Sequence, residues 1–214
     1  MTRAFRFFIL FLFTAMGSAV LVGCANTSAK NSKIYSVPSE PVNNINFIYV
    51  QNDLSVRGSG SSNNRFDVGY ADLPKLFEDR SRAIFPINNI SVRYSHYSRT
   101  EFDQTERANI DKWMMSNPDA ALLTLMVSGG SIISGSNTPR NTLLSFDARL
   151  IDQNTKKLLW YGRFNTRFIA PLIGKASFDE ASVDDLITEI LQKLSADKMI
   201  WLKDGRVAAP PTAK

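Results

Sequence analysis

The chain has 214 residues, a formal net charge of +5, one cysteine and one histidine. Its 25 lysines and arginines are interspersed with 20 acidic residues, without a long run of like charges. Proteins that bind nucleic acid normally carry a basic patch or stripe, so this balance disfavours a nucleic-acid partner. One histidine and one cysteine also provide too few ligands for a typical zinc site, and we expect no metal and no other cofactor.

The first 23 residues have the layout of a secretory signal. Arg3 and Arg6 supply the positive region, and residues 7–22 supply the apolar region. Small and polar residues interrupt this apolar region, which falls short of the about 20 consecutive apolar residues that a membrane-spanning helix needs. The sequence therefore predicts that residues 1–23 direct export and are then removed.

The segment ends in Leu21-Val22-Gly23-Cys24, which resembles the lipobox of bacterial lipoproteins. In a lipobox, a small residue precedes the cleaved bond and the cysteine thiol accepts diacylglycerol. The resemblance implies cleavage between Gly23 and Cys24, and two or three acyl chains that anchor the mature protein stably. Ala25 stands where an Asp retains many such proteins at the inner membrane, so we expect an anchor in the outer membrane, facing the periplasm. Acylation of Cys24 leaves no thiol for a disulfide.

The mature chain divides by composition into three parts. Removal of residues 1–23 takes away two arginines and leaves 191 residues with a formal charge of +3. Residues 24–44 are rich in Asn, Ser, Lys and Pro, which predicts a flexible tether behind the lipid. Residues 204–214 contain a Pro-Pro pair and are predicted to form a disordered tail. Residues 45–203 are long enough for one compact domain with its own core.

Hydrophobic periodicity predicts alternating strands and helices in the first part of this domain. Strands are expected over residues 45–50, 90–97 and 120–127. Asp72 can cap a helix that ends near Pro86, and residues 105–116 have the apolar spacing of a second helix. Residues 120–127 are apolar throughout, so we expect this strand to be covered on both faces at the centre of the sheet.

The sequence of the second part of the domain predicts a β-hairpin and a long helix. Alternating apolar residues over 143–168 flank the turn residues 152–155. The helix has an apolar stripe formed by Val183, Leu186, Ile187, Ile190, Leu191, Leu194 and Trp201. Ser177 and Glu180 have the spacing of a capping box at its start. We therefore expect an α/β (α+β) fold, a mixed β-sheet with helices packed on it in the order β-α-β-(α)-β-β-β-α.

Residues 148–162 read Ala-Arg-Leu-Ile-Asp-Gln-Asn-Thr-Lys-Lys-Leu-Leu-Trp-Tyr-Gly and resemble a strand–turn–strand segment of small periplasmic lipoproteins. Lipoproteins with a domain like the amino-terminal domain of TolB, including CsgG of curli secretion and PelC of exopolysaccharide export, share this layout and a closing helix. The resemblance implies a non-enzymatic role in envelope assembly or secretion, often as an oligomer. In contrast to the pore hairpins of the curli protein, residues 128–141 are predicted to form a loop that interrupts the strands.

The sequence contains no complete catalytic motif. His96 is the one histidine available to a serine triad, and it is expected to be a half-exposed strand residue. The glycine-rich stretches 58–60 and 128–130 lack the Gly-Lys-Ser/Thr ending of a phosphate loop. Paired carboxylates could act in glycoside hydrolysis, and the candidates are Asp147, Asp152, Asp179 and Glu180. For Asp152 a turn role, and for Asp179 and Glu180 helix-end roles, are the preferred interpretations.

Tyrosine and tryptophan side chains provide candidate contact residues because both favour interfaces. Trp160 and Trp201 are expected in the core, whereas Tyr161 and Tyr97 are the candidates for contact with a partner. The leading hypothesis is a non-enzymatic outer-membrane lipoprotein that binds or scaffolds other envelope proteins or further copies of itself. Two alternatives stay open: a periplasmic hydrolase of cell-wall or polysaccharide substrates, and an oligomeric secretion-pore subunit.

Overall fold

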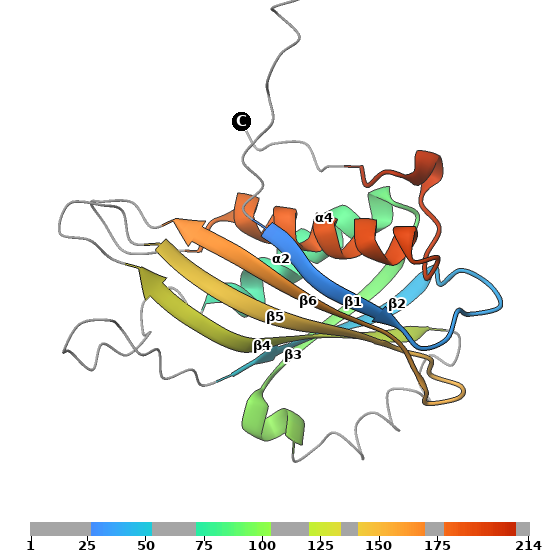
Figure 1. The fold of residues 1–214 in the computed structure, drawn as a ribbon, viewed down its shortest axis with the longest axis horizontal. Coiled ribbons are helices and arrows are strands. Elements are labelled where there is room, and N and C mark those ends of the chain that lie inside the picture. The colour runs from blue at the N-terminus through green and yellow to red at the C-terminus, as the bar shows by residue number, and fades with distance from the viewer. Residues whose placement is uncertain (1–26, 53–71, 104–119, 134–140, 170–177, 209–214) are drawn as a thin grey trace, which may run out of the picture.

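A six-stranded mixed sheet with helices packed on it forms the protein, which agrees with the predicted fold class (Figure 1). The structure is a computed structural model, and it describes residues 27–52, 72–103, 120–133, 141–169 and 178–208. The strands are β1 (Thr27–Ile34), β2 (Asn44–Gln51), β3 (Ser91–Ser98), β4 (Ala121–Ile133), β5 (Asn141–Ile151) and β6 (Leu158–Ile169). The helices are α2 (Leu73–Ile87), α4 (Glu180–Ala196) and the short 3-10 helix η2 (Lys203–Gly205). The predicted signal, Cys24 and the predicted helix over residues 105–116 lie outside the described residues.

The strand order is β1-β6-β5-β4-β2-β3, so β4 lies in the interior of the sheet, as predicted. The pairs β1–β6, β6–β5 and β5–β4 are antiparallel, whereas β2 pairs in parallel with both β4 and β3. β4 extends beyond the predicted residues 120–127 through a bulge between Val127 and Gly129, and it pairs with β5 as far as Ile133↔Asn141. The predicted interruption over residues 128–141 is therefore wrong at both of its ends, where backbone pairing continues the strands.

The hydrophobic core lies between the sheet and the two helices α2 and α4. Figure 1 shows both helices on the same side of the sheet. The largest fully buried side chains include Tyr49, Phe77, Phe146, Phe164 and Trp160. The Trp160 indole also donates a hydrogen bond from Nε1 to Asp197 Oδ2 at 2.7 Å, which ties β6 to the end of α4. The prediction that Trp160 is a core residue is confirmed.

Residues 27–34 form an edge strand, although their composition predicts part of a flexible tether. β1 pairs with β6 from Thr27↔Thr166 to Ile34↔Trp160. Its one buried side chain is Thr27, whose hydroxyl lies 3.0 Å from that of Thr166. An edge strand with most of its side chains in solvent needs few apolar residues, so composition does not distinguish this strand from a tether.

The start of α4 is capped by Asp179, not by the predicted box of Ser177 and Glu180. Asp179 Oδ1 accepts a hydrogen bond from the Ser182 backbone N–H at 2.7 Å, and Oδ2 accepts one from the Ser182 hydroxyl at 2.9 Å. The carboxylate satisfies an unpaired helix N–H and also favours the positive end of the helix dipole. Asp179 therefore has the helix-end role that the sequence indicates. Ser177 lies outside the described residues.

The predicted apolar stripe of α4 is buried from Val183 to Leu194, but Trp201 is 62% exposed. The helix ends at Ala196, and Lys198 then takes a positive φ of 61°. Because the chain leaves the helical path there, Trp201 does not continue the stripe. The prediction that Trp201 packs in the core is wrong.

Residues 204–208 are held against the domain, although the sequence predicts a disordered tail from residue 204. Gln192 Nε2 donates a hydrogen bond to the Gly205 carbonyl at 3.0 Å. The Ala208 N–H donates to Asn88 Oδ1 at 2.8 Å, and Asn88 Nδ2 donates to the Ala208 carbonyl at 3.2 Å. Two side-chain amides thus bind the backbone of this segment, a contact that composition does not predict.

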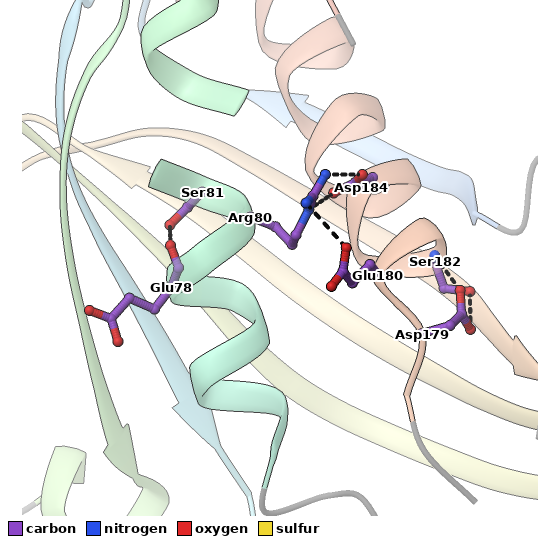
Figure 2. A network of polar contacts seen from close by, with 7 residues as sticks. All are labelled: Glu78, Arg80, Ser81, Asp179, Glu180, Ser182 and Asp184. Atoms are coloured by element: carbon purple, nitrogen blue, oxygen red, sulfur yellow. Dashed lines mark hydrogen bonds and ion pairs between the residues drawn. The ribbon is translucent and has the colours of Figure 1, made fainter. Parts of the chain in front are cut away.

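Arg80 joins the two helices to each other, as Figure 2 shows. Its Nε and Nη2 donate to the two carboxylate oxygens of Asp184 at 2.5 and 2.6 Å, and its Nη1 donates to Glu180 Oε2 at 3.3 Å. The Arg80 side chain is only 16% exposed, so this two-point pairing is partly shielded from solvent. Glu180 and Asp184 therefore fix the position of α4 relative to α2.

We expect Gly162→Ala to lower the free energy of unfolding by about 1–3 kcal/mol, the usual effect of overpacking a core. A Cβ at residue 162 would lie 2.7 Å from Trp160 Cζ2 and 2.9 Å from Phe164 Cε2. Gly129→Ala on β4 is the matched control, because its Cβ would lie 3.9 Å from Ser145 Cβ. Urea unfolding of both variants measures the difference, and equal stability of the two would contradict this packing.

Candidate contact surfaces

The face of the sheet opposite α2 and α4 has an apolar half and a polar half. Over β4, β2 and β3, a small cluster of Ile48, Val50, Leu122 and Phe102 is buried. Phe102 comes from the helical residues 99–103, which follow β3 directly. Arg99 of the same segment donates to the sulfur of Met126 on β4. The segment therefore covers this half of the face with its own side chains.

Over β1, β6 and β5 the same face is polar, and we call this half the open face. Cross-strand registration places Lys33, Tyr161 and Arg149 in one row, and Asn31, Arg163 and Asp147 in the next. Ser145, Asn165 and Arg167 continue the face by strand alternation. Lys33, Arg149, Arg163 and Arg167 are all exposed. The open face is thus a solvent-facing surface on which basic side chains predominate.

Asp147 is the centre of a hydrogen-bond network on the open face. Its Oδ1 accepts from Tyr161 Oη at 2.9 Å and from Arg163 Nε at 2.8 Å, and its Oδ2 accepts from Arg163 Nη2 at 3.3 Å. Burial acts to raise the pKa of Asp147, but the hydrogen bonds from Arg163 and Tyr161 outweigh burial and lower it. Burial and the Asp147 carboxylate both raise the pKa of Tyr161. The network holds Asp147 ionised and Tyr161 protonated.

Tyr161 and Tyr97, the predicted contact residues, lie on the same face of the sheet but not together. Tyr161 is on β6 and Tyr97 is on β3, and three strands separate β6 from β3. Tyr161 is half-buried within the network around Asp147. Tyr97 is half-buried against the apolar cluster, and burial raises its pKa. Whether either side chain contacts a partner stays a prediction.

A second surface, which we call the apolar end, contains the large apolar side chains that the described residues expose. These are Ile34, Tyr35, Val37, Ile87 and Trp201. They lie where β1, α2 and α4 end and β2 begins, at the right of Figure 1. Hydrogen bonds join these segments: the Val42 N–H donates to the Met199 carbonyl at 2.9 Å, and the Ser91 N–H donates to the Asn43 carbonyl at 2.8 Å.

The sequence does not predict the apolar end, because its side chains come from three separate segments, residues 34–37, Ile87 and Trp201. Tyr35 and Val37 are 51% exposed in the connection between β1 and β2, which lies in the predicted tether. The Lys33 ammonium group lies 4.7 Å from the centre of the Tyr35 ring and covers part of it. Trp201 is the most exposed of the five and the best suited to contact a partner.

The carboxylates that the hydrolase alternative requires take part in local contacts. Asp147 pairs with Arg163, and Asp152 Oδ1 accepts from the Thr155 N–H at 2.8 Å in the predicted turn. Asp179 caps α4, and Glu180 pairs with Arg80. A general acid needs a raised pKa, whereas that of Asp147 is lowered. These contacts do not favour the use of the four carboxylates in glycoside hydrolysis.

The remaining site predictions concern lipid, metal and histidine chemistry. Gly23 and Cys24 lie outside the described residues. His96 is exposed on β3, where its ring centre lies 6.3 Å from that of Tyr94. Within the described parts of the chain, no three His, Cys, Asp or Glu side chains gather as a metal site would require. None of the helices described is long and apolar enough to span a membrane.

Comparison with known proteins finds similarity among solved structures, whereas no family model and no curated protein matches. The PelC dodecamer from Paraburkholderia phytofirmans is 12% identical, with a TM-score of 0.43, over 81% of this chain and 99% of that chain. A lipoprotein from Neisseria meningitidis is 14% identical, with a TM-score of 0.40, over 73% of this chain and 99% of that chain. A neuraminyllactose-binding hemagglutinin homolog from Helicobacter pylori is 11% identical, with a TM-score of 0.31, over 75% and 90%. Because these TM-scores are low, the function proposed below rests on the chain's own residues.

We expect Arg163→Met to raise the pKa of Asp147, because burial of the carboxylate is then opposed by fewer hydrogen bonds. Titration of the Asp147 carboxyl by NMR measures the change. Arg149→Met is the matched control, since it removes a cation from the neighbouring row of the open face without removing a hydrogen bond to Asp147. A similar shift in both variants would show that the overall charge, not the Arg163 contact, sets the pKa.

The same change has a defined effect on stability against pH. The folded-state pKa of Asp147 lies below its unfolded value, so its contacts stabilise the fold above the unfolded value. That contribution is lost as the pH falls through the folded-state pKa. The stability difference between wild type and Arg163→Met should therefore shrink on acidification, which urea unfolding at several pH values measures.

Proposed function

We propose that the protein is a non-enzymatic outer-membrane lipoprotein that binds another envelope protein through its apolar end. Acyl chains on Cys24 anchor it after removal of residues 1–23, and the anchored domain faces the periplasm. Support for the anchor comes from the lipobox at the end of the apolar signal region. Support for a binding role comes from Trp201 and its exposed apolar neighbours, because Tyr and Trp dominate the energetics of protein interfaces.

The anchor and the apolar end lie at opposite ends of β1. Only Ala25 and Asn26 separate Cys24 from Thr27, and the three residue steps between them span at most about 10 Å. Acyl chains on Cys24 therefore hold the start of β1 close to the membrane. Strand β1 runs eight residues from Thr27 to Ile34, which places the apolar end roughly 20 Å from that start. A partner could therefore bind the apolar end without contacting the start of β1, where the anchor is attached.

The observation that carries the binding proposal is the gathering of the exposed apolar side chains at one end. Surface apolar residues that are scattered singly need no explanation, whereas exposed apolar residues concentrated at one end of a fold favour an interaction site there. The five side chains come from the ends of β1 and α2, the connection to β2 and the segment after α4. Backbone hydrogen bonds join these segments to one another and so hold the surface in a fixed arrangement.

We expect the mature wild-type protein to lack residues 1–23 and to carry acyl mass that Cys24→Ser abolishes. Intact mass spectrometry of protein extracted from membranes measures both. Separation of inner and outer membranes by density should place wild type with the outer membrane, because Ala25 replaces the Asp that retains lipoproteins. Recovery of a full-length chain without acyl mass would refute the anchor.

We expect a photo-crosslinking residue at position 201 to join the lipidated protein to a defined protein partner in cells. The matched control is the same probe at Ala181, which is exposed near the other end of α4. Trp201→Ala should abolish co-purification of that partner and leave the free energy of unfolding nearly unchanged, because the side chain is 62% exposed. Equal crosslinking from both positions, or none from position 201, would contradict binding at the apolar end.

A further inference from the structure

The open face carries an excess of positive charge that the fold does not neutralise. Its basic side chains are Lys33, Arg149, Arg163 and Arg167, and Asp147 is the carboxylate among them. Asp147 forms an ion pair with Arg163. No carboxylate of the described residues pairs with Lys33, Arg149 or Arg167. The face therefore presents three exposed cations on three adjacent strands, and their charge is available to a ligand outside the chain.

The opposite layer of the molecule has the opposite charge balance. Helix α4 contains Glu180, Asp184, Asp185 and Glu189 against the single cation Lys193. Helix α2 adds three cations, Lys75, Arg80 and Arg82, against Glu78 and Asp79, so the two helices together carry six carboxylates and four cations. The charge of the domain is thus distributed unevenly, with basic groups on the open face and acidic groups on the helical face. Such a distribution orients a protein in the field of a charged surface.

The anchor emerges at the edge of the open face. β1 is the edge strand of the sheet, and its first described residue is Thr27, three residues after Cys24. Lys33 lies on β1 itself, and Arg163 and Arg167 lie on the adjacent strand β6. These cations are within roughly 20 Å of the start of β1 along the strands. A membrane that holds the acyl chains is therefore within reach of the whole face.

We propose that the open face lies against the anionic phospholipid headgroups of the membrane that anchors the chain. The inference rests on the proposed Cys24 anchor and adds an orientation to it. An acyl anchor combined with a basic patch is a recognised two-part mode of membrane attachment. The attraction acts within a Debye length, about 10 Å at 0.1 M salt, so only a short linker lets the face use it. In this orientation α4 and its acidic groups face the periplasm.

The experiment measures vesicle binding by the mature protein with Cys24→Ser, which has the whole mature chain but no acyl group. Flotation uses phosphatidylcholine vesicles with and without phosphatidylglycerol. We expect binding to the anionic vesicles only, with loss of binding at about 1 M salt, where the Debye length is about 3 Å. Arg149→Glu with Arg167→Glu should weaken binding by at least about tenfold, because each cation near an anionic surface contributes about fivefold.

The matched control reverses two cations away from the open face, Lys203→Glu with Arg206→Glu. Both are exposed around η2, and the change in net charge is the same. This variant should bind anionic vesicles within about twofold of the parent protein, since the effect depends on position and not on net charge alone. Thermal unfolding monitored by circular dichroism checks that each variant is folded.

Three results would overturn the inference. One is the absence of binding to anionic vesicles at about 0.1 M salt. Another is equal weakening by the two double variants. The third is binding to the anionic polysaccharide heparin that the open-face variant loses while vesicle binding is unchanged, which would assign the face to a glycan. Failure of the anchor is detected by a different experiment, the mass measurement on wild type. The vesicle assay does not depend on that result, because it uses the Cys24→Ser protein, which carries no acyl group.

Discussion

Two helices can cover only one face of a six-stranded sheet, and the rest of this structure depends on that constraint. α2 and α4 bury alternate side chains of strands β2 to β6, so these strands present apolar side chains toward the helices. The opposite face has to obtain a cover of its own or remain polar. Residues 99–103 cover part of it with Phe102, next to the buried strands β2 and β4. Over β1, β6 and β5 no described element covers this face, and β5 and β6 accordingly alternate between apolar and polar residues.

Elements that contribute many side chains to the core are predictable from the sequence, and elements held by polar contacts are not. The stripe from Val183 to Leu194 and the hairpin around Asp152 follow directly from periodicity. Strand β1 is missed because its sequence, TSAKNSKI, contributes almost nothing to the core and is held by backbone pairing with β6. The segment ending at Ala208 is missed because its partners are the amides of Gln192 and Asn88, far away in sequence.

The two candidate surfaces differ in how far they can be predicted from the sequence. Tyr161 faces away from the core residue Trp160, because alternation along β6 fixes its side. Its basic neighbours are visible in the sequence only as separate charges, since Lys33 lies in the missed strand and Arg149 on another strand. The apolar end escapes prediction for a related reason. Trp201 fits the helical spacing of α4 but follows a residue of positive φ, and periodicity does not register a change in chain direction.

The position of β1 also affects the order of events when the chain is made. Its single neighbour in the described sheet is β6, and Thr27 meets a residue 139 positions later. Contacts between such distant residues form late, because a long loop must close first. On the proposed export route, in which the amino terminus crosses the membrane first, β1 therefore has no strand to pair with until β6 has emerged. For the proposed lipidation, the sheet topology would leave a time window in which processing enzymes act on Cys24 before β1 pairs with β6.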